Sequence, residues 1–241
     1  WIGTARFTVR NTFDILLQEV DVMLIYLDNS ATTAQRREVT ETMLSAMENT
    51  YGNPSSLHRM GVEAEKLVKA SRKAISASLG ESEDGIYFTS GGTESDNTAI
   101  LGACAALKRS GSHIITTAIE HPAVLECFRK LESEGFSVTY LSPDRNGIVS
   151  AEKVRSALRE DTILVSVMHV NNETGAIQPV EEIGALLSGR EHTVFHCDAV
   201  QSFGKIPVPV RAAGIGALSA SGHKIHGPKG VGILFVDHNM R

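Results

Sequence analysis

Asp198 and Lys224 stand at two places where a charged side chain is unusual. Asp198 ends an apolar run that begins near residue 193, and a carboxylate at the end of a buried strand is costly unless it meets a cation. Lys224 follows Ser221-Gly222-His223, in a polar loop with room to enclose it. Together they suggest a buried carboxylate facing a ring nitrogen and a lysine that forms a Schiff base. The alternative for Lys224 is an ordinary solvated lysine.

A glycine-rich segment, residues 90–97, has the form of a phosphate cradle. Gly91 and Gly92 lead directly into a predicted helix, and Thr93 adds a hydroxyl donor. Glycines let the backbone approach an anion, and the free N–H groups of a helix start point at it. The alternative is a tight turn in which Thr93 caps the helix.

Two further loops carry polar side chains after apolar runs. His121 precedes Pro122, which can start a helix. The imidazole could act as an acid or base, stack on a flat cofactor, or simply cap that helix. Asn171 and Asn172 offer uncharged donors and acceptors suited to a carboxylate or phenolate, although asparagines are also common turn formers.

The histidines raise a competing interpretation, a metal site. The candidate ligands match no structural zinc pattern, because the chain has no Cys-x-x-Cys pair. In addition, two of the histidines straddle a predicted junction between a helix and a strand. We therefore expect no bound metal. The candidate ligands are His192, His196, Cys197, Asp198, His223 and His226.

The elements that must position these loops alternate between helical and strand-like patterns. Helices are predicted at 35–49, 61–79 (ended by Gly80), 93–108, 122–134, 151–158 and 180–187. Strands are predicted at 24–28, 86–89, 113–117, 138–141, 162–168, 193–196, 217–220 and 231–236. Such alternation predicts an α/β fold, with a mainly parallel sheet and helices on both faces. Ligands of these sheets bind at the loops that follow the strands.

Composition limits the function classes. The 241 residues include 23 Lys+Arg and 28 Asp+Glu, a net charge of −5, with 42% hydrophobic residues. This balance is typical of a globular protein with one core, or one core plus an appendage. No basic block and no run of about 20 apolar residues is present, so we expect neither nucleic acid nor a membrane as partner. Three cysteines without close spacing favour a reducing compartment, and we expect a cytoplasmic location.

The candidate loops belong to a series of motifs along the chain: residues 27–33 (LDNSATT), 51–56 (YGNPSS), 89–97 (TSGGTESDN), 120–121 (EH), 171–175 (NNETG), 198–202 (DAVQS), 221–224 (SGHK) and 225–230 (IHGPKG). Taken in order, these motifs resemble those of the cysteine desulfurases, class V pyridoxal-phosphate enzymes, and more closely the iron–sulfur and nitrogen-fixation branch. The resemblance runs from Met23 to the C-terminus and implies a fold type I PLP-dependent transferase large domain.

The resemblance implies a role for each candidate residue. Lys224 would form the Schiff base with pyridoxal 5′-phosphate, Asp198 would pair with the pyridinium nitrogen, and Gln201 would hydrogen-bond the phenolic oxygen. His121 would stack on the ring and transfer protons, and Asn172 would lie by the cofactor and the substrate carboxylate. The implied phosphate-binding residues are Gly92, Thr93, Ser221 and His223.

By the same resemblance the protein would be a homodimer that converts L-cysteine to L-alanine. Its sulfur would pass as a persulfide to acceptor or scaffold proteins of iron–sulfur cluster assembly. Residues 1–22 would be an extension of unknown role and residues 23–241 the PLP-binding large domain. We expect the chain to stop before the family's small C-terminal domain, whose loop carries the nucleophilic cysteine. Cys104, Cys127 and Cys197 do not match that loop.

Two other functions stay open at this point. The pocket residues that choose the substrate lie mainly in the missing C-terminal domain, so a selenocysteine lyase or another class V enzyme is one alternative. A non-catalytic remnant or scaffold that binds pyridoxal phosphate is the other.

Overall fold

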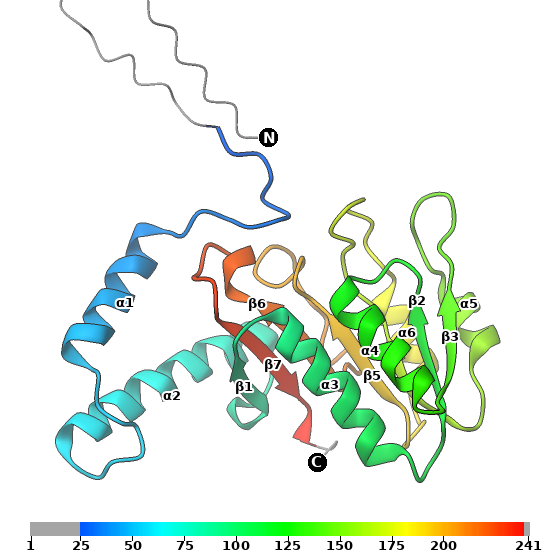
Figure 1. The fold of residues 1–241 in the computed structure, drawn as a ribbon, viewed down its shortest axis with the longest axis horizontal. Coiled ribbons are helices and arrows are strands. Elements are labelled where there is room, and N and C mark those ends of the chain that lie inside the picture. The colour runs from blue at the N-terminus through cyan, green and yellow to red at the C-terminus, as the bar shows by residue number, and fades with distance from the viewer. Residues whose placement is uncertain (1–24, 239–241) are drawn as a thin grey trace, which may run out of the picture.

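The computed structural model describes residues 25–238, which form one seven-stranded sheet flanked by helices (Figure 1). The strand order is β1-β7-β6-β5-β4-β2-β3. β7 is antiparallel to both of its neighbours, and the other paired strands run parallel. The strands are β1 (Ile86–Thr89), β2 (His113–Thr117), β3 (Ser137–Leu141), β4 (Thr162–Ser166), β5 (Val194–Asp198), β6 (Ala217–Ser221) and β7 (Gly232–Val236).

Helices cover both faces of the sheet, which confirms the predicted α/β architecture. Neighbouring residues of one strand point to opposite faces, and Ile114 and Ile115 of β2 accordingly belong to different cores. Ile114 packs with α3 and α4, whereas Ile115 packs with α5, α6 and the end of α2. The helices are α1 (Arg37–Asn49), α2 (Arg59–Leu79), α3 (Gly92–Leu107), α4 (Pro122–Ser133), α5 (Ala151–Ala157) and α6 (Val180–Leu187), with short 3₁₀ turns η1 (Glu83–Gly85) and η2 (Gly222–Lys224).

Local sequence signals set several helix ends. Gly80 ends α2 in the left-handed conformation with φ 69°, as its position in the sequence predicts. Pro122 is the first residue of α4, where its missing N–H and fixed φ do no harm. Ser150 caps α5 by accepting the N–H of Lys153.

The predicted strand at 24–28 is wrong for the residues that the structure describes. Residues 25–28 form no strand, and Ile25, Tyr26 and Leu27 are exposed. This short apolar run meets a turn at once, in which Ala31 N–H donates to the Asp28 carbonyl, and no strand within residues 25–238 pairs with it. The other predicted elements are present with shifts of one or two residues at their ends. The extension at residues 1–22 lies outside the described residues.

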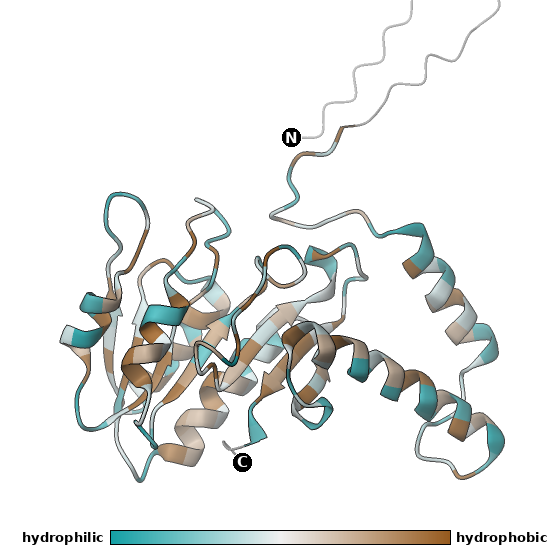
Figure 2. Ribbon diagram, turned by 180° about the vertical axis from the view of Figure 1, so that it is seen from behind, coloured by the Kyte–Doolittle hydropathy of each residue, from teal (hydrophilic) through white to brown (hydrophobic). Residues whose placement is uncertain are grey.

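An arm made of α1 and the first half of α2 projects away from the sheet (Figures 1 and 2). No residue of α1 is buried. Apolar side chains are exposed along the arm: Leu44, Met47, Tyr51, Leu57, Met60, Val62 and Leu67.

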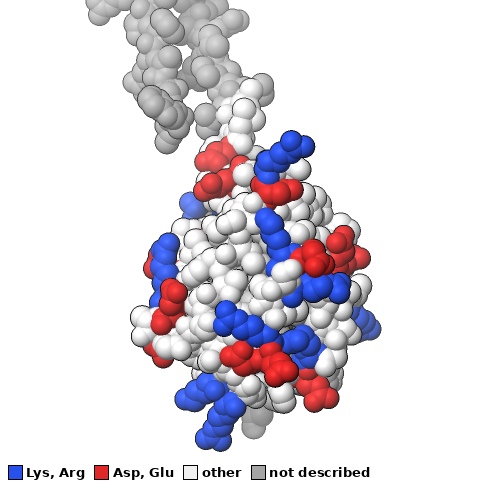
Figure 3. Space-filling view, turned by 90° about the vertical axis from the view of Figure 1, so that its right-hand side faces the viewer, with Lys and Arg blue, Asp and Glu red and all other residues white. Residues whose placement is uncertain are grey.

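Charge is mixed on the visible surface. At the end of the molecule that carries β3 and α5, acidic and basic side chains are interspersed (Figure 3). Between residues 25 and 238, no helix combines the length and apolar character that crossing a membrane requires.

Candidate active site

A cavity of about 580 Å³ lies at the edge of the sheet where β2, β4, β5 and β6 end. Its size is within the range of small-molecule sites. The loop after β1 reaches the same edge, because β1 and β6 both run antiparallel to β7. The cavity brings together all nine residues singled out in the sequence: Gly92, Thr93, His121, Asn172, Asp198, Gln201, Ser221, His223 and Lys224.

The glycine-rich segment packs tightly beneath one end of the cavity. α3 begins at Gly92, and no side chain caps the helix from Gly91. A Cβ added to Gly92 would lie 2.7 Å from Val200 Cγ2 and 3.6 Å from Ser221 Cβ. The alternative in which Thr93 caps the helix is wrong, because Thr93 lies inside the first turn. The first turn of α3 lines the cavity at Gly92 and Thr93, and a helix start without a side-chain cap has the properties of an anion site.

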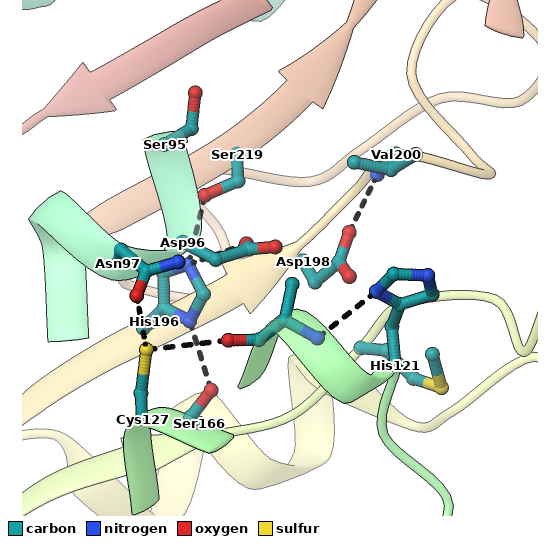
Figure 4. A network of polar contacts seen from close by, with 12 residues as sticks. Ser95, Asp96, Asn97, His121, Cys127, Ser166, His196, Asp198, Val200 and Ser219 are labelled. Carbon is teal, nitrogen blue, oxygen red and sulfur yellow. Dashed lines mark hydrogen bonds and ion pairs between the residues drawn. The ribbon is translucent and has the colours of Figure 1, made fainter. Parts of the chain in front are cut away.

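Asp198 is the last residue of β5 and is only 5% exposed. Its Oδ1 accepts the N–H of Val200 at 2.9 Å (Figure 4). Burial raises the pKa of Asp198, while the Val200 N–H and the charges of His121 and Lys224 act in the opposite direction. A buried carboxylate with one backbone donor is well suited to a cation placed in the cavity.

Lys224 lies at the end of η2, and its amine meets an N-terminal strap, residues 28–33. Lys224 Nζ donates to the carbonyl of Ser30 and, at 2.9 Å, to that of Ala31. Burial and the nearby charge of Lys205 lower the pKa of Lys224. A lowered pKa increases the share of neutral amine, which is the nucleophilic form. Lys224 is half-buried rather than an ordinary solvated loop lysine.

The strap also contacts two other candidate residues. Gln201 Nε2 donates to the Ser30 carbonyl at 2.9 Å, and His223 Nδ1 lies 3.1 Å from Thr32 Oγ1. Thr33 donates to the His223 carbonyl through both its N–H and its hydroxyl, each at 2.9 Å. The strap is therefore fastened to the β6–β7 connection and forms one wall of the cavity.

His121 caps a helix and also lines the cavity. Its Nδ1 caps α4 by accepting the N–H of Ala123 at 3.1 Å, and its ring still lines the cavity. The cap makes Nδ1 the acceptor, so Nε2 carries the proton of the neutral ring. The neighbouring asparagines divide their roles: Asn171 holds its own turn by accepting the N–H groups of Glu173 and Thr174, whereas Asn172 lines the cavity.

Several residues around the cavity carried no predicted role. Ser30, Ala31 and Asp96 line it, and Glu120 lies buried behind it. Glu120 Oε1 accepts the Thr117 hydroxyl at 2.6 Å and the Met168 N–H at 3.0 Å. Burial raises the pKa of Glu120 to about 8, although the hydrogen bonds from these two donors lower it. The sequence could have revealed Asp96, because this acid occupies the buried face of α3 together with Ser95, Ala99 and Ile100.

The three cysteines are free and buried, and none lines the cavity. Cys104 and Cys127 lie on α3 and α4, and Cys197 precedes Asp198 in β5. Burial raises the pKa of Cys104 to about 12 and that of Cys127 to about 11. A thiol held in its neutral form is a poor nucleophile.

Comparison with known proteins places the chain in a family. The family model described as aminotransferase class-V matches residues 25–241. The chain belongs to the class-V aminotransferase family. A putative cysteine desulfurase IscS 1 of Bacillus subtilis is 52% identical over 218 residues, 90% of this chain and 57% of the relative. The cysteine desulfurase IscS of Methanosarcina thermophila is 49% identical, again over 90% of this chain and 54% of the relative.

Two solved structures resemble this chain in fold. A NifS-like protein superposes with a TM-score of 0.86 at 41% identity, covering 90% of this chain and 60% of that one. A structure described as SspA in complex with cysteine has a TM-score of 0.83 at 42% identity, covering 88% and 60%. The chain thus spans a little over half the length of the relatives it matches.

Class-V aminotransferases and cysteine desulfurases use pyridoxal phosphate, and this cavity fits that cofactor. The α3 terminus offers uncapped N–H groups at one end of the cavity. A buried carboxylate, Asp198, and a half-buried amine, Lys224, line the same space. These are the three kinds of group that a phosphate, a pyridinium nitrogen and an aldehyde require.

Proposed function

We propose that this chain is the PLP-binding large domain, residues 23–241, of a cysteine desulfurase that converts L-cysteine to L-alanine and passes the sulfur on as a persulfide. The observation that carries the proposal is the convergence of Asp198, Lys224 and the α3 terminus on one cavity. The relatives named cysteine desulfurase, and the neighbour with cysteine bound, support the substrate.

When bound, pyridoxal phosphate supplies an electron sink that lets the substrate Cα lose its proton. Lys224 would hold the cofactor through its amine and then move that proton. Asp198 would keep the proton on the ring nitrogen. To react, the Lys224 amine must leave the carbonyls of Ser30 and Ala31 that it contacts in this structure.

The other residues would bind and orient the cofactor and the substrate. His121 would stack on the ring and transfer protons, Gln201 would hydrogen-bond the phenolic oxygen, and Asn172 would bind near the substrate carboxylate. The proposed phosphate-binding residues are Gly92, Thr93, Ser221 and His223.

The sulfur step needs a thiolate that attacks the substrate sulfur. An S–S bond forms, the substrate Cβ–S bond breaks, and its electron pair takes up a proton at Cβ to give alanine. The buried, neutral cysteines of the described chain do not suit that task. We propose that a cysteine on the family's C-terminal domain performs it and delivers sulfur to acceptor or scaffold proteins of iron–sulfur assembly.

We also propose that the protein is a cytoplasmic homodimer. The three unpaired cysteines support a reducing compartment. The exposed apolar side chains of the arm support burial against a second copy, because large apolar side chains gathered on one part of a protein often mark an interface.

An absorbance spectrum tests the cofactor assignment. We expect purified protein mixed with pyridoxal phosphate, then freed of excess, to keep a visible band that Lys224→Ala lacks. Lys205→Ala is the matched control, because Lys205 is the nearby lysine whose amine contacts Gln201 Oε1. Retention of the band in Lys224→Ala would reject Lys224 as the cofactor lysine.

Turnover is tested separately on the complete protein. Alanine released from L-cysteine at a higher kcat/KM than from L-selenocysteine is expected for a desulfurase. The reverse preference would identify a selenocysteine lyase, and cofactor binding without alanine release would identify a non-catalytic protein.

A further inference from the structure

Two buried carboxyl groups, not one, line the cavity. Asp198 ends β5, and Asp96 reaches the same space from the second turn of α3 (Figure 4). Their exposed fractions are 5% and 1%. Two ionised carboxylates in one buried site repel each other, so such pairs hold at least one proton between them.

The two carboxyl groups differ in what compensates a negative charge. Asp198 accepts the Val200 N–H, and the charges of His121 and Lys224 favour its ionised form. Asp96 Oδ1 has no hydrogen-bond partner among the described residues, and Ser219 is the one side chain among them that favours the ionised form of Asp96. Within residues 25–238, the one group near Oδ1 that could carry a positive charge is His196, whose Nε2 lies 3.5 Å away. A single negative charge is therefore more stable on Asp198 than on Asp96.

His196 does not supply the missing positive charge. It is fully buried, with Nδ1 2.8 Å from Ser166 Oγ and Nε2 3.0 Å from Ser219 Oγ. Hydroxyls both donate and accept, so they satisfy a neutral ring in either tautomer. Burial lowers the pKa of His196 to about 3, and the ring is neutral at physiological pH.

The remaining titratable groups around Asp96 are also acids. Burial raises the pKa of Asp96 well above its ordinary value, Asp198 and Glu120 raise it further, and only Ser219 lowers it. No cation of the described chain faces Asp96 directly. The titratable groups that interact with it electrostatically are Glu120 from the loop after β2, Cys127 from α4, and His196 and Asp198 from β5, together with Cys197, which points to the other face of the sheet.

We propose that Asp96 is a neutral, protonated acid in the wall of the cavity, a positioning residue that leaves the single negative charge of the pair on Asp198. This deepens the proposed function, on which the assignment of Asp198 to the ring nitrogen rests. A second negative charge beside Asp198 would raise the affinity of that carboxylate for the proton that the ring nitrogen should hold. A neutral Asp96 adds no such charge to the site.

Infrared spectroscopy of the cofactor-free protein tests the protonation directly. The difference spectrum between the parent and Asp96→Asn at neutral pH should contain the C=O stretch of a protonated carboxyl group. A difference confined to carboxylate bands would overturn the proposal. This readout needs no cofactor, so it stands even if the spectrum with pyridoxal phosphate rejects Lys224 and the proposed function.

Carbon-13 NMR of the parent labelled at its aspartates covers the case in which Asp96→Asn does not fold. At least one aspartate carboxyl should still be protonated at neutral pH. Absence of any protonated aspartate in the parent overturns the proposal. The proposal is also overturned if the protonated signal of the parent disappears in Asp198→Asn while Asp96 titrates as an ordinary aspartate, because the proton would then belong to Asp198.

The visible absorbance band of the bound cofactor provides a further test, because its pH midpoint depends on the charge of Asp96 and not on a purely structural role of that residue. Because an amide imitates a neutral acid, Asp96→Asn should leave the pH midpoint of the visible band unchanged. Were Asp96 ionised, removing its charge would shift that midpoint downward by about one pH unit. Asp96→Ala leaves space and removes the polar group, and it should weaken cofactor retention where Asp96→Asn does not.

Discussion

At the scale of single residues, three carboxyl groups of the described chain are buried in or near the cavity: Asp96, Glu120 and Asp198. Glu120 illustrates the thermodynamic consequence. Its carboxyl accepts two hydrogen bonds at Oε1, while Oε2 is buried without a partner. Burial raises its pKa from 4.5 to about 8, so the folded protein holds a proton that the unfolded chain has already released.

The pKa of Glu120 predicts a pH-dependent gain in stability for Glu120→Gln. The stabilisation from the bound proton is complete below pH 4.5 and is lost as the pH rises toward 8, by at most about 5 kcal/mol. The glutamine Oε1 can accept the same two hydrogen bonds and does not titrate. The difference in Tm between variant and parent should therefore grow from pH 5 to pH 8 in thermal melts.

Glu126→Gln provides the matched control, because Glu126 is exposed on α4. Its Tm difference from the parent should stay flat over the same range. A flat difference for Glu120→Gln as well would show that Glu120 is ionised in the folded protein.

At the scale of elements, α3 connects the sheet to the proposed phosphate site. Its first residue packs against Val200 and Ser221, which come from the loop after β5 and from β6. Its buried face carries the small residues Ser95 and Ala99, and this allows α3 to lie close to β6 and β7. The position of the helix start is thus determined by close contact rather than by a cap.

Two glycine-to-alanine changes in α3 should therefore have opposite effects. Gly92→Ala places a methyl group 2.7 Å from Val200 Cγ2, and we expect a loss of about 1–3 kcal/mol in stability and weaker retention of pyridoxal phosphate. Gly102→Ala meets nothing within 4 Å, so it should add about 0.5–1 kcal/mol through helix propensity. Chemical denaturation and cofactor titration measure both. Equal effects of the two changes would contradict the close-contact argument.

The elements were largely predictable because they depend on local pattern. The strands at 86–89 and 113–117 and the helix at 180–187 have the bounds that periodicity and turn residues predict. The run at 24–28 failed because a strand also needs a neighbour to pair with. The nine candidate residues share one cavity, and their individual roles stay predictions. The contact of Lys224 with Ser30 spans 194 positions, and no local pattern reveals it.

At the scale of the whole molecule, the arm is the feature that the sheet does not explain. α1 buries none of its residues, and its apolar side chains therefore add little to the stability of this fold. Leu44 and Met47 lie on one side of α1, three residues apart, and both are exposed. The proposed dimer is the state in which that surface would be covered.

The double change Leu44→Glu with Met47→Glu should weaken association. Because α1 buries none of its residues, the Tm of the monomer should not fall, as measured with parent and variant both diluted below the dissociation constant of the dimer. Thr42→Glu is the control, since a residue two positions from Leu44 lies about 160° away around the helix. Analytical ultracentrifugation should show the double variant as a monomer at concentrations where the parent and Thr42→Glu are dimers. If the parent protein is itself monomeric, the proposed dimer through α1 is wrong.

The antiparallel β7 has a consequence for how the protein emerges from the ribosome. β1 pairs only with β7 within the described sheet, and about 140 residues separate the two strands in the chain. At typical rates of synthesis, β1 waits roughly 7–28 s for its partner. Throughout that interval the hydrogen-bonding edge of β1 and its aromatic residues, Tyr87 and Phe88, are open to other nascent chains. The stretch from Ile86 to Thr89 is therefore where we expect a chaperone to bind during translation.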